Sequence, residues 1–385
     1  MNSTAPKKVS PKQVARSSVN DLDPYIPGRP INAIKDEFGL DKVVKLASNE
    51  SSVKMPEGIC QAIVDAIENV SRYPDGHARE LRRALEKDLD IPFETMLIGN
   101  GAEDCINMIG QAFLNPGDES IIPEPTFDAY RVATEFMDAT PVYVPLKEDS
   151  IDLDRVLGAV TAKTKIVWIC SPNNPTGTVL KKQAFDDFLD QLPDNIVVVL
   201  DQAYWEYITS ENPANACDYL DTDARVIGIR TFSKVFGLAG LRIGYLTAHP
   251  SIVEVIAKVK PPFNVNVLAQ AAAIAALKEK TFKEQHLETT RVEREKMIAG
   301  FKARGITVTP TETNFLMVPL PFNGDDLFNR LLSQGVIVRP GSVFKIPNAI
   351  RLSIGNPEEN QFFLEKFDQA MLEMMGEQDQ NAISV

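Results

Sequence analysis

The segment from Arg230 to Tyr245, RTFSKVFGLAGLRIGY, places one lysine among small residues and follows it with an arginine. A lysine that forms an imine with a cofactor aldehyde needs neighbours that let a flat ring approach, and a cation that holds a phosphate group. Lys234 and Arg242 fit these two roles. The segment therefore predicts a site for a cofactor that carries both groups.

A glycine-containing segment could bind the phosphate. The sequence IGNGAED (98–104) follows a strand-like pair at 96–97 and precedes a helical pattern over 105–113. The N terminus of such a helix presents free backbone amides to an anion. Gly99 and Gly101 could equally form a tight turn, and taken alone they favour that interpretation.

Asp201 follows a very apolar run at 196–200. A carboxylate at the end of a buried strand is costly unless a cation or hydrogen-bond donors meet it, and a pyridinium nitrogen would be such a partner. The alternative is an aspartate that caps a helix or a turn. The turn-rich sequence SPNNPTG (171–177) could be part of a site or an ordinary surface loop. Its position after a buried strand favours a role in a site.

Arg339 and Arg351 each lie at a short apolar run, VIVR and IRL. An arginine fork suits bidentate binding of a carboxylate or a phosphate, whereas the simpler interpretation is two solvated strand ends. Two arginines together favour an anionic substrate.

Buried strands are predicted where β-branched residues gather, at 166–170, 196–200 and 226–229. A helical pattern over 185–192 separates the first two, which predicts a parallel α/β architecture. Open sheets of this kind bind ligands at the carboxyl ends of their strands. Polar segments follow each strand at once, and we expect them to meet there: 171–177, 201–204 and 231–234.

The C-terminal part of the chain predicts a second unit. Residues 266–305 are mostly helical in pattern, first alanine-rich and then densely charged, and could carry the chain from one domain into another. Strands of a smaller α+β unit are expected at 314–319, 336–339 and 349–354, with a closing helix over 358–375.

Composition excludes several classes of protein. The chain of 385 residues has a formal net charge of −13, which argues against nucleic acid as a partner. Its 4 cysteines and 3 histidines are widely spaced, so we expect no metal site and reduced thiols, typical of a cytoplasmic protein. No apolar run predicts a membrane span, and residues 1–20 form a polar, basic leader that we expect to be disordered.

A set of motifs in a fixed order resembles the pyridoxal-phosphate-dependent aminotransferases of fold type I, and within them the histidinol-phosphate aminotransferases. No single motif decides the resemblance; their number and order do. The motifs are PYIPG (24–28), LASNE (46–50), YPDG (73–76), NGA (100–102), PTF (125–127), NNPTG (173–177), the Lys234 segment and PFNVN (262–266).

The resemblance implies an α/β fold with a large, mostly parallel α/β domain and a smaller α+β domain. The division it implies is a flexible leader over 1–20, an N-terminal arm and part of the small domain over 21–49, a large pyridoxal-phosphate domain over 50–264, and an interdomain helix with the C-terminal small domain over 265–385.

The resemblance also implies a role for each matching residue. Lys234 would hold the cofactor as an internal aldimine and move the proton of the substrate, and Asp201 would pair with the pyridinium nitrogen. Tyr204 and Asn174 would bind the phenolic oxygen, and Phe127 would stack on the ring. The phosphate would be held by Gly101, Ala102, Glu103, Ser233 and Arg242, with Tyr73 reaching the phosphate of a neighbouring subunit. A homodimer with composite active sites follows.

The substrate end of the site would be lined by Tyr25, Asn174, Arg339 and Arg351. Histidinol phosphate carries a phosphate and glutamate carries two carboxylates, so one arginine-rich site could serve both half-reactions. The implied reaction interconverts L-histidinol phosphate and 2-oxoglutarate with imidazole acetol phosphate and L-glutamate, in histidine biosynthesis. No metal takes part.

Two departures from the family pattern affect the prediction of the substrate. Gln202 stands where glutamate is frequent, and Ser51-Ser52 stand where Asn-Pro is common. An aromatic amino acid aminotransferase would use the same cofactor residues and stays open as an alternative. A decarboxylase acting on threonine phosphate is a more remote one, and a regulator with a DNA-binding module is remoter still.

Overall fold

The computed structural model describes residues 10–20, 22 and 28–383, and the side chains of the last helix as far as Met374. The larger of the two layered units is built on a seven-stranded sheet in the order β2-β8-β7-β6-β5-β3-β4. Six of these strands run in the same direction, and β8 runs antiparallel to them. The strands are β2 (Met96–Gly99), β3 (Glu119–Glu124), β4 (Thr140–Pro145), β5 (Thr164–Cys170), β6 (Val197–Asp201), β7 (Val226–Thr231) and β8 (Gly244–Ala248). The predicted strands at 166–170, 196–200 and 226–229 are therefore adjacent and parallel.

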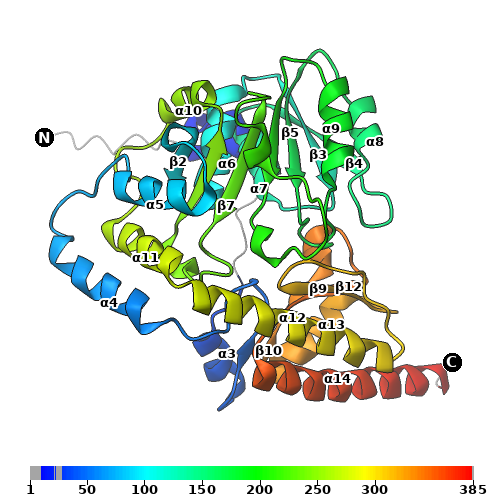
Figure 1. The fold of residues 1–385 in the computed structure, drawn as a ribbon. Coiled ribbons are helices and arrows are strands. Elements are labelled where there is room, and N and C mark those ends of the chain that lie inside the picture. The colour runs from blue at the N-terminus through cyan, green and yellow to red at the C-terminus, as the bar shows by residue number, and fades with distance from the viewer. Residues whose placement is uncertain (1–9, 21, 23–27, 384–385) are drawn as a thin grey trace, which may run out of the picture.

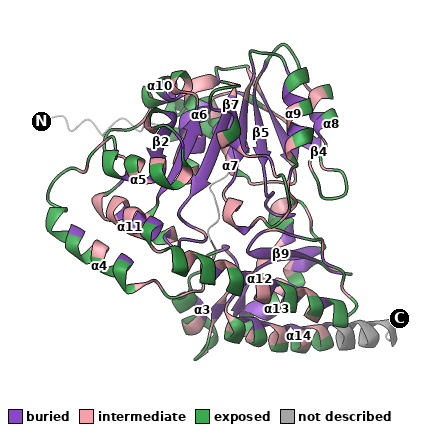
Figure 2. Cartoon of the chain, in the orientation of Figure 1, coloured by how far each residue is buried: buried purple, intermediate pink, exposed green. Residues whose placement is uncertain are grey.

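The central strands β5, β6 and β7 are buried on both faces, as their colour in Figure 2 shows. Alternate residues of β5 point to opposite faces: Trp168 packs into one hydrophobic cluster, and Val167 and Ile169 into another. The first face is covered by α6 (Ala102–Phe113), α7 (Ala129–Phe136) and α10 (Pro250–Ala257). The second is covered by α8 (Leu153–Gly158), α9 (Lys182–Gln191), α5 (Arg79–Leu89) and α11 (Val267–Lys278). This double cover explains the continuous apolar runs of the strands.

The smaller unit contains an antiparallel sheet in the order β11-β12-β9 and a parallel pair of β1 with β10. Its strands are β1 (Val44–Lys45), β9 (Phe315–Pro319), β10 (Val336–Ile337), β11 (Arg339–Pro340) and β12 (Ala349–Ser353), and its helices include α3 (Ile31–Phe38), α13 (Gly324–Ser333) and α14 (Pro357–Ile383). The single strand expected at 336–339 is divided between two sheets. Val336 pairs with Val44 of the N-terminal arm, whereas Arg339 pairs with Arg351, because the chain changes partners between them.

The long helix α12 (Lys280–Ala303) joins the two units and lies between them in Figure 1. The alanine-rich helix α11 precedes it and packs against α4 (Glu57–Ala66) and α5, where Ala269, Ala272 and Ala276 enter the hydrophobic cluster of the large unit. Small side chains allow this close helix contact. Helix α11 therefore packs on the large unit, and α12 follows it along the chain.

Several short elements complete the described chain. Two of them lie in the leader, α1 (Pro11–Val14) and α2 (Ser17–Asn20), although its composition predicted disorder. Arg16 forms an ion pair with Asp138 at 3.1 Å and lies over the ring of Phe136, so residues 10–20 rest against the end of α7. The 3-10 helices are η1 (Ile67–Asn69), η2 (Phe93–Thr95), η3 (Trp205–Tyr207), η4 (Ala216–Tyr219), η5 (Ala239–Leu241) and η6 (Gly341–Phe344).

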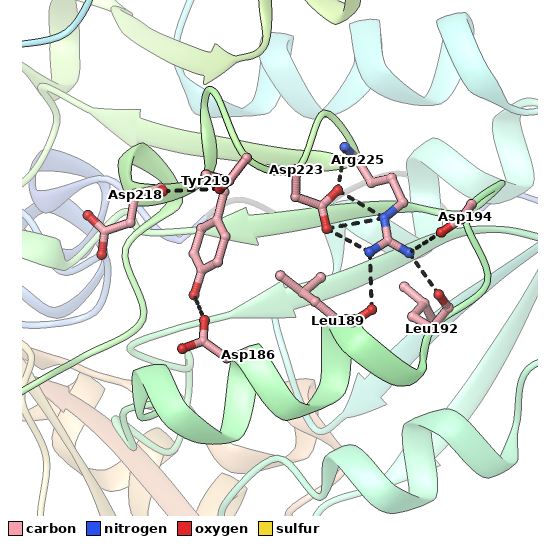
Figure 3. Close-up of polar contacts among 9 residues, drawn as sticks. Asp186, Leu189, Leu192, Asp194, Asp218, Tyr219, Asp223 and Arg225 are labelled. Atoms are coloured by element: carbon pink, nitrogen blue, oxygen red, sulfur yellow. Dashed lines mark hydrogen bonds and ion pairs between the residues drawn. The ribbon is translucent and has the colours of Figure 1, made fainter.

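Arg225 connects the C-terminal end of α9 to the segment that leads into β7 (Figure 3). Arg225 donates to the carbonyl oxygens of Leu189 and Leu192 at the C-terminal end of α9, at 3.1 and 2.7 Å, and forms an ion pair with Asp223 at 2.6 Å. The last carbonyls of a helix lack partners within the helix, so a guanidinium group suits this position. Arg225 directly precedes β7, whose far end leads into the Lys234 segment. Within the described residues, no helix combines the length and apolarity needed to span a membrane.

Candidate active site

A cavity of about 400 Å³ opens at the carboxyl ends of the central strands. Cys170, Asp201 and Thr231, the last residues of β5, β6 and β7, all line it. This confirms that the predicted strands bring their following polar segments to one place. Most of the residues named from the sequence also line the cavity: Ala102, Glu103, Phe127, Asn174, Asp201, Tyr204, Ser233, Lys234, Arg242, Arg339 and Arg351.

Lys234 follows β7 in a tight turn, which the bond from the amide of Gly237 to the carbonyl of Lys234 closes at 2.9 Å. Its Nζ donates to the carbonyl of Ser48 at 3.3 Å and lies 5.5 Å from the ring centroid of Tyr204. Burial, and then the positive charges of Arg351 and Arg242, lower the pKa of Lys234 to about 8. The amine therefore loses its proton readily, and a neutral amine can act as a nucleophile or a base.

Asp201 ends β6 with only 3% of its surface exposed. It accepts hydrogen bonds from the hydroxyl of Tyr130 at 2.7 Å and from the amide of Ala203 at 3.0 Å. Burial raises the pKa of Asp201 to about 6, although these two donors and Lys234 oppose the rise. A cation beside the carboxylate would keep it ionised.

The N terminus of α6 faces the guanidinium of Arg242 across Gly101. Gly101 has a φ of 94° and a ψ of 167°, and a Cβ atom on it would lie 2.7 Å from Nη2 of Arg242. Only glycine leaves room for the arginine so close to the first amides of the helix. These amides and Arg242 together form a cradle for an anion.

Ser233 completes this cradle. Its Oγ accepts from the hydroxyl of Thr231 at 2.9 Å, and its amide donates back to the same Thr231 oxygen at 3.1 Å. The proton of the Ser233 hydroxyl therefore stays available to a ligand in the cavity.

Arg339 and Arg351 face each other across the antiparallel pair of β11 and β12. Residues directly opposite in such a pair have side chains about 5 Å apart at Cβ. Arg351 donates to Oδ1 of Asn174 and to the carbonyl of Ala47, both at 2.7 Å, and its guanidinium lies over the ring of Phe344 at 5.0 Å. Because Oδ1 of Asn174 accepts from Arg351, its amide nitrogen is the group that can donate into the cavity.

Two of the predicted residues that the structure describes do not line this cavity: Gly101, which lies against Arg242, and Tyr73. Tyr73 is 83% exposed and stacks on Phe263, with ring centroids 4.7 Å apart. Tyr25 lies outside the described residues. Gln202, one of the two departures from the family pattern, also faces elsewhere: its side chain holds the backbone of Ala214 and Ala216, each at 3.2 Å. Among the described residues, no group of histidines, cysteines and acids could hold a metal ion.

Sequence reasoning missed several residues of the site, and three of them bind its key side chains. Tyr130 holds Asp201 and stacks on Trp168 at 5.2 Å, but an aromatic residue in a helical pattern is usually part of a core. Phe344 covers Arg351 from a short 3-10 helix that has no sequence signal. Asn49 donates to the hydroxyl of Tyr204 at 2.8 Å, and the motif LASNE was its only signal.

Comparisons with known proteins agree with this geometry. A family model described as aminotransferase class I and II matches residues 41–367. The histidinol-phosphate aminotransferase of Moorella thermoacetica is 39% identical over 350 residues, with 91% of each chain covered. That of Bacillus subtilis is 38% identical over 350 residues, which cover 91% of this chain and 97% of the relative. Among solved structures, the histidinol-phosphate aminotransferase of Sinorhizobium meliloti in complex with pyridoxal-5'-phosphate has a TM-score of 0.86 at 24% identity, covering 94% of this chain and 100% of its own.

Proposed function

The chain belongs to the class I and II aminotransferases and, within them, to the histidinol-phosphate aminotransferases, and we propose that it interconverts L-histidinol phosphate and 2-oxoglutarate with imidazole acetol phosphate and L-glutamate. The observation that carries the proposal is the convergence of Lys234, Asp201 and two arginines on one cavity, in a chain 39% identical to such an enzyme over most of its length.

The residues of the cavity fit pyridoxal 5'-phosphate. The cradle of Gly101, Ala102, Glu103, Ser233 and Arg242 suits its phosphate group, since it combines helix amides, a hydroxyl donor and a cation. When bound, this cofactor supplies an aldehyde for the amino group and a ring that accepts electrons from the substrate carbon. The structural match to the Sinorhizobium meliloti protein supports the same cofactor.

Each remaining group has a task that its environment supports. Asp201, whose burial raises its pKa, would bind the protonated ring nitrogen and be kept ionised by it. Tyr204 and the amide nitrogen of Asn174 would donate to the ring oxygen, and Phe127 would lie against the ring. Lys234, with its pKa lowered to about 8, would hold the cofactor and then carry the proton that leaves the substrate carbon.

The arginines explain how one cavity would take two different substrates. Arg339 and Arg351 lie on facing positions of β11 and β12, so their guanidinium groups can reach the same anionic end of a substrate. Phosphate suits them in one half-reaction and a carboxylate in the other. We also propose that Tyr25, which lies outside the described residues, lines this end of the site.

We further infer a homodimer in the cytoplasm. Large apolar side chains are exposed along α4 and the residues after it, and on Phe263, which stacks on Tyr73. This exposure supports burial against a second subunit: Val64, Ile67, Val70, Tyr73 and Phe263. Tyr73 would reach the cofactor phosphate of that subunit. Light scattering of the purified protein measures the oligomeric state, and an active monomer would contradict the composite site.

Single-turnover kinetics tests the substrate. The purified protein is loaded with pyridoxal phosphate, and the change in its visible absorption is followed with L-histidinol phosphate and, separately, with L-phenylalanine. Faster conversion by L-histidinol phosphate is the expected result. The reverse order would instead identify an aromatic amino acid aminotransferase, and release of carbon dioxide from threonine phosphate would identify a lyase.

A further inference from the structure

Asn49 binds the hydroxyl group of Tyr204, a residue of the cavity. Its Nδ2 donates to the Tyr204 oxygen at 2.8 Å, and only 1% of the surface of Asn49 is exposed. The residues are 155 positions apart in the sequence, one in the N-terminal arm and the other after β6. A buried contact between such distant segments is formed only in the assembled site.

Three other hydrogen bonds fix the orientation of the Asn49 amide. The hydroxyl of Ser353 donates to its Oδ1 at 3.0 Å and accepts from its backbone amide at 2.8 Å. Asn314 donates to its backbone carbonyl at 3.0 Å. Because Oδ1 is occupied by Ser353, the nitrogen of the side chain must face Tyr204. Residues of the small domain, on β12 and before β9, thus set the direction of the bond.

The direction of this bond decides what Tyr204 can do. Its oxygen already accepts a hydrogen bond from Asn49, so its own hydroxyl proton is left for another acceptor. Burial raises the pKa of Tyr204 to about 12, and the group therefore keeps that proton at neutral pH. Tyr204 lines the cavity, which is where an acceptor would lie.

We propose that Asn49 is a positioning residue that makes Tyr204 a hydrogen-bond donor into the cavity. The proposal rests on the proposed function in one respect, that the acceptor is the ring oxygen of the cofactor. The relay runs from Ser353 to Asn49, from Asn49 to Tyr204, and from Tyr204 to the ligand. It links the small domain to the chemistry of the large one.

The backbone of Asn49 defines the variant that tests this proposal. Its φ of 54° is a left-handed conformation, which glycine adopts without strain and alanine does not. Asn49→Gly therefore removes the amide group and leaves the backbone conformation accessible. A stability control is Asn360→Ala, which removes another buried amide group, from α14 of the small domain, where Asn360 binds Gly355 and Glu293.

The first experiment uses the protein without cofactor. Difluorotyrosine, which titrates near neutral pH, is incorporated at position 204, and its ionisation is followed by fluorine NMR. A donor from Asn49 stabilises the phenolate, so Asn49→Gly should raise the pKa of the probe by about one pH unit. An unchanged pKa, or an equal rise in Asn360→Ala, would overturn the relay whatever reaction the enzyme catalyses.

The second experiment uses the loaded enzyme. Asn49→Gly should lower kcat about tenfold, and by less than about twofold in the Tyr204→Phe background, because Asn49 acts through the hydroxyl. Both single variants should also raise the pH midpoint of the visible absorption band, since a donor to the ring oxygen favours the form with fewer protons. Additive losses in kcat would overturn the proposal. If Tyr204→Phe changes neither kcat nor the midpoint, the assigned acceptor is wrong, while the titration without cofactor still reports on the bond itself.

Discussion

Replacing Gly101 by alanine should weaken binding of the cofactor by more than its effect on the stability of the fold explains. Two effects combine at this position. The backbone has a φ of 94° and a ψ of 167°, a region that residues with a side chain enter only at a cost of about 1–3 kcal/mol. The added Cβ would also lie 2.7 Å from Nη2 of Arg242, so the guanidinium must move away from the helix N terminus.

The size of the loss follows from what Arg242 would bind. A hydrogen bond to a charged group contributes about 1.5–3 kcal/mol, so moving the guanidinium away from the phosphate should weaken pyridoxal-phosphate binding by about 10- to 100-fold. Isothermal calorimetry on the cofactor-free protein measures this affinity directly. Denaturant unfolding on the same samples separates the loss of affinity from the cost of the backbone conformation.

Gly117 supplies the matched control. Its φ is 86°, yet a Cβ atom on it would meet nothing within 4 Å. Gly117→Ala should therefore destabilise the fold through its backbone and leave the affinity for the cofactor unchanged. If Gly101→Ala binds pyridoxal phosphate as tightly as the parent protein, or if both variants lose the same affinity, the cradle at α6 is not the phosphate site.

Three further substitutions test the catalytic role of Lys234, the binding of the substrate phosphate and the stability of the fold. Lys234→Ala should leave the circular dichroism spectrum intact and reduce single-turnover rates by about 10²–10⁴-fold or more, and retained turnover would remove its catalytic role. Arg339→Ala should raise KM about tenfold or more for L-histidinol phosphate and less for L-phenylalanine; equal increases would exclude it from phosphate binding. Arg225→Met removes the guanidinium that pairs with Asp223 and donates to the carbonyls of Leu189 and Leu192, so urea unfolding should show a loss of about 2–4 kcal/mol with KM unchanged (Figure 3). Arg291→Met, on an exposed ion pair, is its control and should leave the unfolding free energy nearly unchanged.

The parts of the fold that the sequence predicted are those with local signals. Runs of β-branched residues located β5, β6 and β7, and the polar segments behind them located the cavity. A parallel sheet with both faces covered requires such runs, and the ends of its strands must meet at one edge. Most of the candidate residues therefore lie together, as predicted.

The parts that the sequence did not predict depend on contacts between distant segments. Tyr130 and Asp201 are 71 positions apart, and Asn49 and Ser353 are 304 apart. Neither pair has a periodicity or a spacing that could reveal it. The strand at 336–339 was divided for a similar reason, because Val44, far upstream, pairs with its first half. The alanines of α11 suggested a linking helix, but their small size allowed them to pack into the core of the large unit.

The buried Asp201 shows why these distant contacts matter for function. An aspartate in the unfolded chain loses its proton near its ordinary pKa of 3.8, whereas in the folded protein burial raises the pKa of Asp201 to about 6. The folded state thus binds the proton more tightly, and stability falls as the pH rises between these values. At pH 7 the difference corresponds to a cost of about 3 kcal/mol, at 1.36 kcal/mol per pH unit.

A ligand cation beside Asp201 would offset the cost of burying the ionised carboxylate. The site should therefore bind a protonated ring nitrogen. Asp201→Asn should therefore raise the unfolding free energy of the cofactor-free protein by up to about 3 kcal/mol at pH 7 and by roughly half as much at pH 5, where the native carboxyl already holds its proton. The same variant should bind pyridoxal phosphate more weakly, because the neutral amide does not pair with the ring cation. Urea unfolding at both pH values and calorimetric titration measure the two effects. A variant that is less stable than the parent at pH 7 would show that Tyr130 and Ala203 already compensate the buried charge, and that the cofactor is not needed to do so.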